Sequence, residues 1–123
     1  MPHLRTKLGD FGEQTAAMYF TRLGMPVVAR KWRCAAGEID LIVRDGAALV
    51  FVEVRTRRGA PGNAAESVGL RKQERLIALA YAYLDTHSTS PDTPWRIDVV
   101  AIDVDRFGAV ANLNHIRDAV EEH

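Results

Sequence analysis

The spacing of apolar residues along the chain predicts two amphipathic helices. The first helix spans about residues 6–23 and ends at Gly24, with Pro26 close behind, which is a common stop pattern. The second helix spans about residues 67–86 and follows a segment rich in glycine and proline. The predicted apolar positions are Leu8, Phe11, Tyr19 and Leu23 in the first helix and Leu70, Leu76, Ile77, Tyr81 and Leu84 in the second.

Runs of β-branched and other apolar residues predict five strands between and after these helices. Asp45-Gly46 joins the second strand to the third, and an Asp-Gly pair between such runs is a strong hairpin signal. The segment 56–66 is expected to be a loop. The long helix after it predicts a right-handed crossover that makes the third and fourth strands parallel. The predicted strands are residues 26–32, 38–44, 48–54, 96–104 and 109–113.

The fold class that follows is α/β, with a mixed β-sheet flanked by helices in the order α-β-β-β-α-β-β. A chain of 123 residues suits one domain with a hydrophobic core of its own. We expect that core over about residues 6–104, with a final strand and tail over residues 105–123.

Acidic side chains gather on one face of the predicted hairpin. A two-residue loop pairs the two strands so that Asp40 lies opposite Phe51 and Glu38 lies opposite Glu53. Because side chains alternate along a strand, both glutamates share a face with Asp40 and Arg55. Like charges that face each other destabilise a sheet, so this cluster needs a neutralising partner.

A divalent cation is one such partner, because Mg²⁺ prefers carboxylate oxygens as ligands. The four histidines are scattered and Cys34 is the only cysteine, so the chain has no His/Cys cluster at zinc spacing. The expected ion is therefore Mg²⁺ (or Mn²⁺), held by Asp40 and Glu53. The alternative is a solvated strand face on which Arg44 or Arg55 neutralises the acids.

Two polar residues fall at or beside the apolar faces of the predicted helices. Glu13 lies at the edge of the first face, near Ala16 and Phe20, and the usual exposure of helical acids favours a solvated side chain. Gln73 lies at the centre of the second apolar arc, where its amide needs hydrogen-bond partners. Either backbone groups satisfy this amide, or it points at a metal-bound water or a phosphate.

Several short runs resemble a known family: Gly12-Glu13, Trp32-Arg33-Cys34, Gly37-Glu38-Ile39-Asp40-Leu41-Ile42, Val52-Glu53-Val54-Arg55 and Arg71-Lys72-Gln73. They look like the YraN/UPF0102 family, which is similar to archaeal Holliday-junction resolvases within the PD-(D/E)xK, restriction-endonuclease-like superfamily. The resemblance covers about residues 8–103 and implies an αβββαβ core with a Mg²⁺-dependent phosphodiesterase site. It also implies a homodimer, because resolvases present two active sites to a two-fold junction.

The resemblance places the metal-binding acids of such a site at Glu13, Asp40 and Glu53, and it places Arg55 where PD-(D/E)xK sites usually carry lysine. An arginine effectively cannot lose its proton, so Arg55 cannot act as a general base. Its planar fork can still bind phosphate oxygens. The candidate catalytic set is therefore these four residues with Gln73, acting on DNA, with branched DNA among the candidate substrates.

Two other functions fit the same residues. One is a catalytically weak or inactive nucleic-acid-binding module of the same fold, which Arg55 favours. The other is an interaction domain whose acidic residues bind a protein partner.

Basic residues near the hairpin and the glycine-rich segment are candidates for phosphate contacts. A stacking role is possible for Trp32 among them, although a core position is favoured for this ring. The net charge of zero excludes a protein that coats nucleic acid by bulk charge. However, residues 28–75 hold ten Lys/Arg and six Asp/Glu, whereas residues 92–123 hold three and seven. The candidate contacts are Arg30, Lys31, Arg33, Arg57, Arg58, Arg71, Lys72 and Arg75.

The remaining features concern the compartment. The single Cys34 cannot form an intramolecular disulfide, and no stretch approaches the roughly 20 apolar residues of a membrane span. The first dozen residues lack the apolar core of a signal peptide. We therefore expect a cytoplasmic protein with no membrane partner, in which His87 and His115 are ordinary surface or loop residues.

Overall fold

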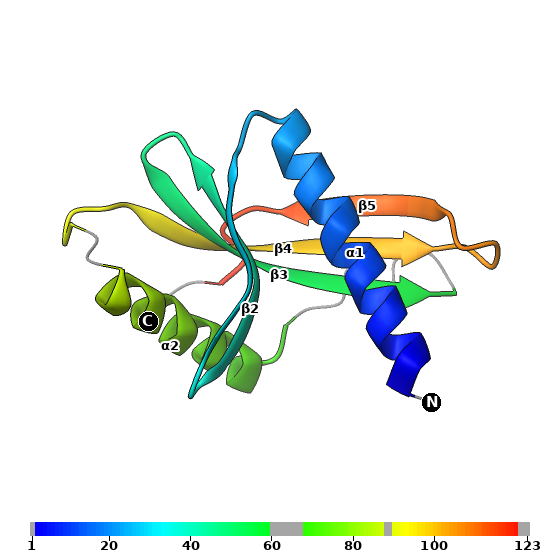
Figure 1. Ribbon diagram of the computed structural model, residues 1–123, viewed down its shortest axis with the longest axis horizontal. Helices are drawn as coiled ribbons and strands as arrows, with labels where there is room; N and C mark the ends of the chain where they lie inside the picture. The colour runs from blue at the N-terminus through cyan, green and yellow to red at the C-terminus, as the bar shows by residue number, and fades with distance from the viewer. Residues whose placement is uncertain (1, 60–67, 88–89, 121–123) are drawn as a thin grey trace.

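The computed structural model describes residues 2–59, 68–87 and 90–120, which form two helices and a five-stranded sheet (Figure 1). The predicted α/β class and the predicted order of elements are confirmed. Neither helix in the described part of the chain is long and apolar enough to cross a membrane. The elements are α1 (Pro2–Arg22), β1 (Val27–Cys34), β2 (Gly37–Asp45), β3 (Ala48–Arg58), α2 (Leu70–Thr86), β4 (Trp95–Val104) and β5 (Val110–Ile116).

The strands follow one another across the sheet in chain order. The neighbours β3 and β4, which α2 connects, are parallel as predicted, and the other neighbouring pairs are antiparallel. Alternate residues of β3 supply two separate cores, because Val50 and Val52 pack with α1 whereas Leu49 and Phe51 pack with α2. The two helices therefore cover opposite faces of the sheet (Figure 1).

The buried face of α1 differs from the predicted one. Phe11 and Leu23 were expected inside, but they are 38% and 54% exposed. The helix instead buries a face that includes Gly12, Ala16 and Phe20. Small residues select this face because they allow close approach to the sheet, and a Cβ added at Gly12 would lie only 1.8 Å from a side-chain oxygen of β3.

The hairpin loop lies one residue later than predicted. Asp45 pairs with Ala48, so the two loop residues are Gly46 and Ala47 rather than Asp45 and Gly46. Gly46 has a φ of 59° and Ala47 has no positive φ, and glycine at the first loop position is typical of a type II′ turn. The predicted pairing of Asp40 with Phe51, and with it that of Glu38 with Glu53, is therefore wrong by two residues. The two-residue displacement keeps every side chain on its predicted face.

Two further features differ from the prediction and shape the site: where the pairing of β2 with β3 ends, and where β3 itself ends. The β2–β3 ladder ends at the pair Leu41 and Val52, so the part of β2 up to Asp40 is not paired with β3. On its other side, β3 continues to Arg58 along the buried β4, although a loop was expected from residue 56. The rest of that expected loop, residues 60–66, lies outside the described residues.

Candidate metal centre

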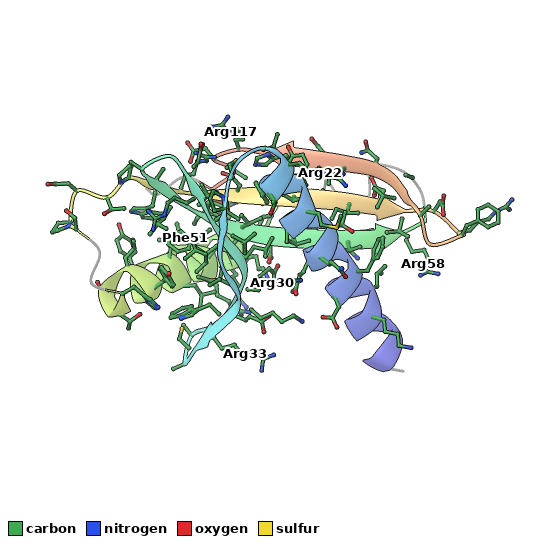
Figure 2. The ribbon with its side chains drawn as sticks, turned by 45° about the horizontal axis from the view of Figure 1, so that its top comes forward. Arg22, Arg30, Arg33, Phe51, Arg58 and Arg117 are labelled. Carbon is green, nitrogen blue, oxygen red and sulfur yellow. The ribbon has the colours of Figure 1, made fainter. Side chains whose placement is uncertain are left out.

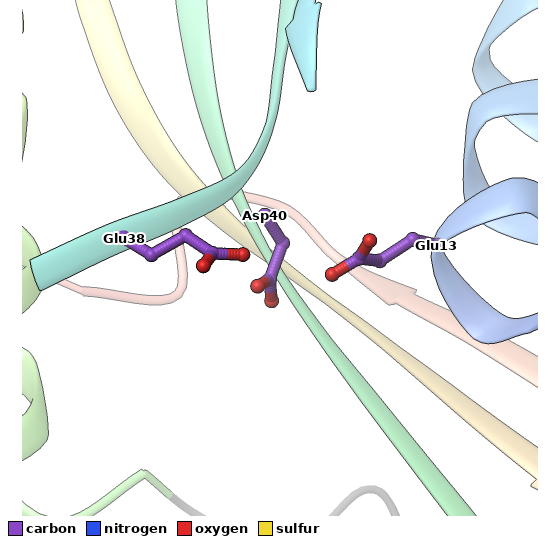
Figure 3. A group of neighbouring side chains, drawn as sticks. All are labelled: Glu13, Glu38 and Asp40. Carbon is purple, nitrogen blue, oxygen red and sulfur yellow. The ribbon is translucent and has the colours of Figure 1, made fainter. Parts of the chain in front are cut away.

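Three carboxylates from two separate elements converge beside the point where β2 leaves β3 (Figure 3). Glu13 comes from α1, and Glu38 and Asp40 come from β2. Each offers one oxygen, and these oxygens all lie within 4.8 Å of one another. Glu38 belonged to the predicted acidic face but was not among the expected metal ligands. Its signal in the sequence was its position two residues before Asp40 on the same strand.

Glu13 is buried, with 8% of its surface exposed, so the expectation of a solvated side chain is wrong. The close approach of α1 at Gly12 carries the neighbouring Glu13 to the sheet. Its Oε2 atom is buried and lies 3.3 Å from the Nζ atom of Lys31, yet it has no hydrogen-bond partner among the described residues. A buried, unsatisfied carboxylate oxygen is costly and marks a position where a ligand would be stabilising.

Asp40 lies at the centre of this cluster (Figure 3). Its Oδ2 atom accepts a hydrogen bond from the backbone N–H of Val54 at 2.8 Å, where the ladder between the strands has ended. Burial, a hydrogen bond shared with Glu53 and the charge of Glu13 raise the pKa of Asp40 from 3.8 to about 8. Near neutral pH this carboxyl group therefore keeps its proton unless a cation replaces it.

Glu53 lies outside the group of three but contacts it through Asp40. The expected juxtaposition of these two acids is therefore present. The corrected register explains it, because Asp40 and Glu53 are the next residues beyond the last ladder pair, Asp40 just before Leu41 on β2 and Glu53 just after Val52 on β3. The Glu53 side chain is only 12% exposed, and its Oε2 atom lies 2.9 Å from the Nζ atom of Lys72 on α2.

Two lysines thus flank the acids from opposite sides of the sheet. Lys31 pairs with Asp10 and Glu13 on the α1 side, and Lys72 pairs with Glu53 on the α2 side. The hydrogen bond with Asp10 and the charge of Glu13 raise the pKa of Lys31, so it stays a cation. Lys31 also has a φ of 51°, which is unusual for a residue other than glycine. These ammonium groups offset part of the negative charge of the cluster.

A pocket of about 270 Å³ opens beside Glu53 and Lys72, and Arg55 also lines it. Val68 and Gly69, just before α2, form its opposite wall. Gln73 contacts this segment, because its Nε2 atom donates a hydrogen bond to the carbonyl oxygen of Val68 at 2.7 Å. Of the two alternatives for the Gln73 amide, a backbone partner is therefore the one observed for its Nε2 atom.

The candidate phosphate-binding residues lie in several places. Arg57 and Arg58 are exposed at the end of β3, and Arg71, Lys72 and Arg75 are exposed on α2. Arg30 lines a separate groove beside α1, whereas Arg33 donates a hydrogen bond to Glu38 at 2.9 Å. Trp32 is half-buried and packs edge-on against Tyr83 and His87, as expected for a core position.

A second polar cluster was not predicted. The side chain of Asp98 on β4 is fully buried and accepts hydrogen bonds from Arg96 at 3.0 Å and from the backbone of Asp118 at 2.9 Å. His115 lies 2.7 Å from Asp98 and 3.0 Å from the hydroxyl of Tyr19, so the expectation of an ordinary surface or loop histidine is wrong. The signal was an aspartate within the apolar run of β4, because a buried acid requires partners.

Comparisons with known proteins agree with the short runs noted in the sequence. A family model described as "Uncharacterised protein family UPF0102" matches residues 12–102. A UPF0102 protein of Roseiflexus castenholzii is 57% identical over 119 residues, which cover 96% of each chain. A UPF0102 protein of Chloroflexus aurantiacus is 48% identical over 122 residues, or 99% of each chain. A UPF0102 protein of Streptomyces griseus is 49% identical over 107 residues, covering 85% of this chain and 89% of the relative. The chain therefore belongs to the UPF0102 family.

Proposed function

We propose that this protein hydrolyses phosphodiester bonds in DNA with the help of a divalent cation bound at the acidic cluster. The observation that carries the proposal is the convergence of Glu13, Glu38 and Asp40, which come from two elements and bring their oxygens within 4.8 Å. A fold has no need to bring three acids together in a partly buried place, because their mutual repulsion destabilises it.

The residues at the cluster fit a hard cation. The ligands offered are all carboxylate oxygens, which Mg²⁺ and Mn²⁺ prefer. The Oε2 atom of Glu13 has an ion pair with Lys31 but no hydrogen bond, and the pKa of Asp40 is raised; a bound cation would remove both costs. When bound, such an ion lowers the pKa of a coordinated water and neutralises charge on a phosphate group.

The chain's own residues would position the substrate and the ligands. The N–H of Val54 fixes the orientation of the Asp40 carboxylate, and Lys72 fixes that of Glu53. Arg55 and Lys72 supply positive charge to the pocket beside these acids, where phosphate oxygens would be stabilised. The exposed Arg57 and Arg71 extend the positive charge along the nucleic-acid backbone. In a homodimer, two such sites would suit a two-fold branched DNA.

One observation favours a second candidate function, which is nucleic-acid binding without turnover. Arg55 cannot accept a proton, and the nearby amine of Lys72 is held as an ion pair with Glu53. A site without a free base would bind the phosphate backbone and cleave it slowly or not at all.

The test is the cleavage of branched and single-stranded DNA in the presence of Mg²⁺ or Mn²⁺. We expect wild-type protein to cleave, and we expect Asp40→Asn and Glu53→Gln to reduce cleavage strongly. Glu74→Gln is the matched control, because Glu74 is an exposed acid on α2 outside the cluster. Equal cleavage by all four proteins would contradict the proposal, and DNA binding without cleavage by wild type would support the second candidate.

A further inference from the structure

The turn between β4 and β5 presents an aromatic side chain to solvent. Phe107 is 80% exposed, which exceeds the exposure of every other large apolar side chain in the described ranges. The guanidinium carbon of Arg106 lies over the ring, 4.8 Å from its centroid. This ring contributes little to the folding of the protein, because only about a fifth of its surface is removed from water.

The turn that carries Phe107 is held in one conformation by hydrogen bonds within it. The side-chain Oδ1 atom of Asp105 accepts hydrogen bonds from the backbone N–H groups of Phe107 at 2.8 Å and Ala109 at 3.0 Å. The N–H of Asp105 in turn donates to the carbonyl of Ala109 at 2.9 Å, and Gly108 adopts a φ of 84°. Little ordering entropy would therefore be lost when the ring contacts a ligand.

Arginines lie beside this turn as well as within it, together with the acid Asp105. The end of β3 lies beside it, since Arg58 pairs with Val104 and the N–H of Gly59 donates to the carbonyl of Val104 at 3.3 Å. Figure 2 shows Arg58 at the end of the sheet where β4 leads into this turn. Arg57 and Arg58 are both exposed, and neither forms an ion pair within the part of the chain that the structure describes.

We propose that Phe107 stacks on an unpaired base of DNA while Arg57, Arg58 and Arg106 contact the adjoining phosphates. Stacking on an aromatic ring beside basic groups is how proteins bind single-stranded nucleic acid with little sequence preference. A lipid surface is the weaker occupant, because one ring provides too little apolar area for stable membrane binding. The substrate class that follows is a duplex with unpaired nucleotides, such as a gap, a flap or a branch.

The position of this turn also predicts the distance between the unpaired nucleotides and the bond that is cleaved. This prediction rests on the proposed function for the place of the scissile bond, which would lie near Glu53. From Glu53 to Arg58 the strand rises about 17 Å, at about 3.3 Å per residue. This length corresponds to about five base pairs of duplex at a rise of about 3.4 Å. A duplex whose axis runs along β3 would therefore place its unpaired nucleotides about five base pairs from the bond that is cleaved.

The experiment measures binding in a chelator, so that no cleavage interferes with it. Fluorescence anisotropy compares a blunt duplex, a gapped duplex and a four-way junction with wild type and Phe107→Ala. We expect Phe107→Ala to weaken binding of the gapped duplex by about five- to 150-fold, the range expected for loss of one stacked base. Binding of the blunt duplex should stay unchanged. Phe107→Trp should retain the preference, whereas Phe107→Leu should lose it.

Two control variants and a vesicle assay isolate the contribution of the ring. Arg58→Ala should weaken binding of all three DNAs and lower their salt dependence, because it removes a phosphate contact. Leu23→Ala removes an exposed apolar side chain that lies just beyond the C-terminal end of α1, and it should change no affinity. Phosphatidylserine vesicles test the lipid occupant. If Phe107→Ala abolishes vesicle binding and leaves DNA binding unchanged, the proposal is overturned.

The outcomes also distinguish this proposal from the proposed function. A Phe107→Ala protein that binds gapped DNA as wild type does would overturn the stacking role, even if Mg²⁺-dependent cleavage is found. A gap preference that depends on Phe107, in a protein that never cleaves, would support the stacking role and contradict the nuclease. A wild-type protein that binds no DNA would overturn both.

Discussion

Replacing Asp40 with asparagine removes the charge at the centre of the acidic cluster while keeping its shape. The new side chain can still accept the hydrogen bond from the N–H of Val54, and it can donate one to Glu53. We expect Asp40→Asn to be more stable than wild type at about pH 8 in the absence of divalent cations. The two proteins should be much closer in stability near pH 4.

The magnitude follows from the pKa of Asp40, which burial and the contact with Glu53 raise from 3.8 to about 8. Between these values the unfolded chain has lost a proton that the folded protein keeps, so the free energy of unfolding falls as pH rises. The slope for one proton is about 1.4 kcal/mol per pH unit. Between about pH 5 and pH 7.5 the free energy of unfolding of wild type should fall by about 3 kcal/mol relative to that of Asp40→Asn. Above the folded-state pKa the difference levels off.

Urea unfolding at several pH values measures this difference, with Glu74→Gln as a control for loss of an exposed acid. Adding Mg²⁺ should restore much of the lost stability to wild type, and more so at higher pH, because the ion binds the deprotonated carboxylates. It should not do so for Asp40→Asn. Parallel stability curves for wild type and Asp40→Asn across this pH range would show that the pKa of Asp40 is not raised in the folded protein.

Three further changes test the architecture around the cluster. Gly12→Ala places a Cβ 1.8 Å from Thr56 Oγ1, so urea unfolding should show a free energy of unfolding that is lower by about 1–3 kcal/mol. This loss should shrink in a Thr56→Ala background. An equal loss in both backgrounds would contradict the close contact. Asp98→Ala takes the acid partner from His115 and from the backbone N–H of Asp118 and leaves Arg96 with Asp45 alone, so we expect a loss of about 3–5 kcal/mol in the same assay. A loss below about 1 kcal/mol would show that the cluster is not structural. Glu13→Gln removes a negative charge that raises the pKa of Asp40, so ¹³C NMR titration of the Asp40 carboxyl should give a lower pKa, and an unchanged value would mean that the two groups are not in electrostatic contact.

The faces of the hairpin could be predicted from the sequence even though its register could not. Side chains alternate with a period of two, so the displacement between the predicted and observed loops left Asp40 and Glu53 on one face. The displacement itself arises from Gly46, which takes the first loop position because that position needs a positive φ. An Asp-Gly pair does not by itself say which of the two residues begins the loop.

The contribution of α1 could not be read from a helical wheel. A wheel ranks positions by hydrophobicity, and it favoured Phe11 and Leu23 over the small residues that in fact face the sheet. Close packing at Gly12 depends on the strand that lies against it, which a wheel does not contain. Glu13 is buried through this packing, and only the family resemblance pointed to its place among the acids.

The partners of buried charges also lay beyond the sequence pattern. Asp98 is an acid within an apolar strand, which signals that it needs a partner, but its partner His115 comes from β5, whose register on β4 was not predicted. In the same way, the pairing of Lys72 with Glu53 depends on how α2 packs across β3. Contacts between distant segments of the chain decide both clusters, and local periodicity does not encode them.

We propose above that the three converging carboxylates bind a divalent cation. A crystal of the wild-type protein soaked in Mn²⁺ tests it most directly, because the anomalous signal of manganese locates the ion. We expect a peak at Mn²⁺–oxygen bonding distance from Glu13, Glu38 and Asp40, and no peak there in crystals of Asp40→Asn. An empty cluster in the wild-type crystal, with Glu13 still paired to Lys31 and Glu38 still paired to Arg33, would contradict this proposal.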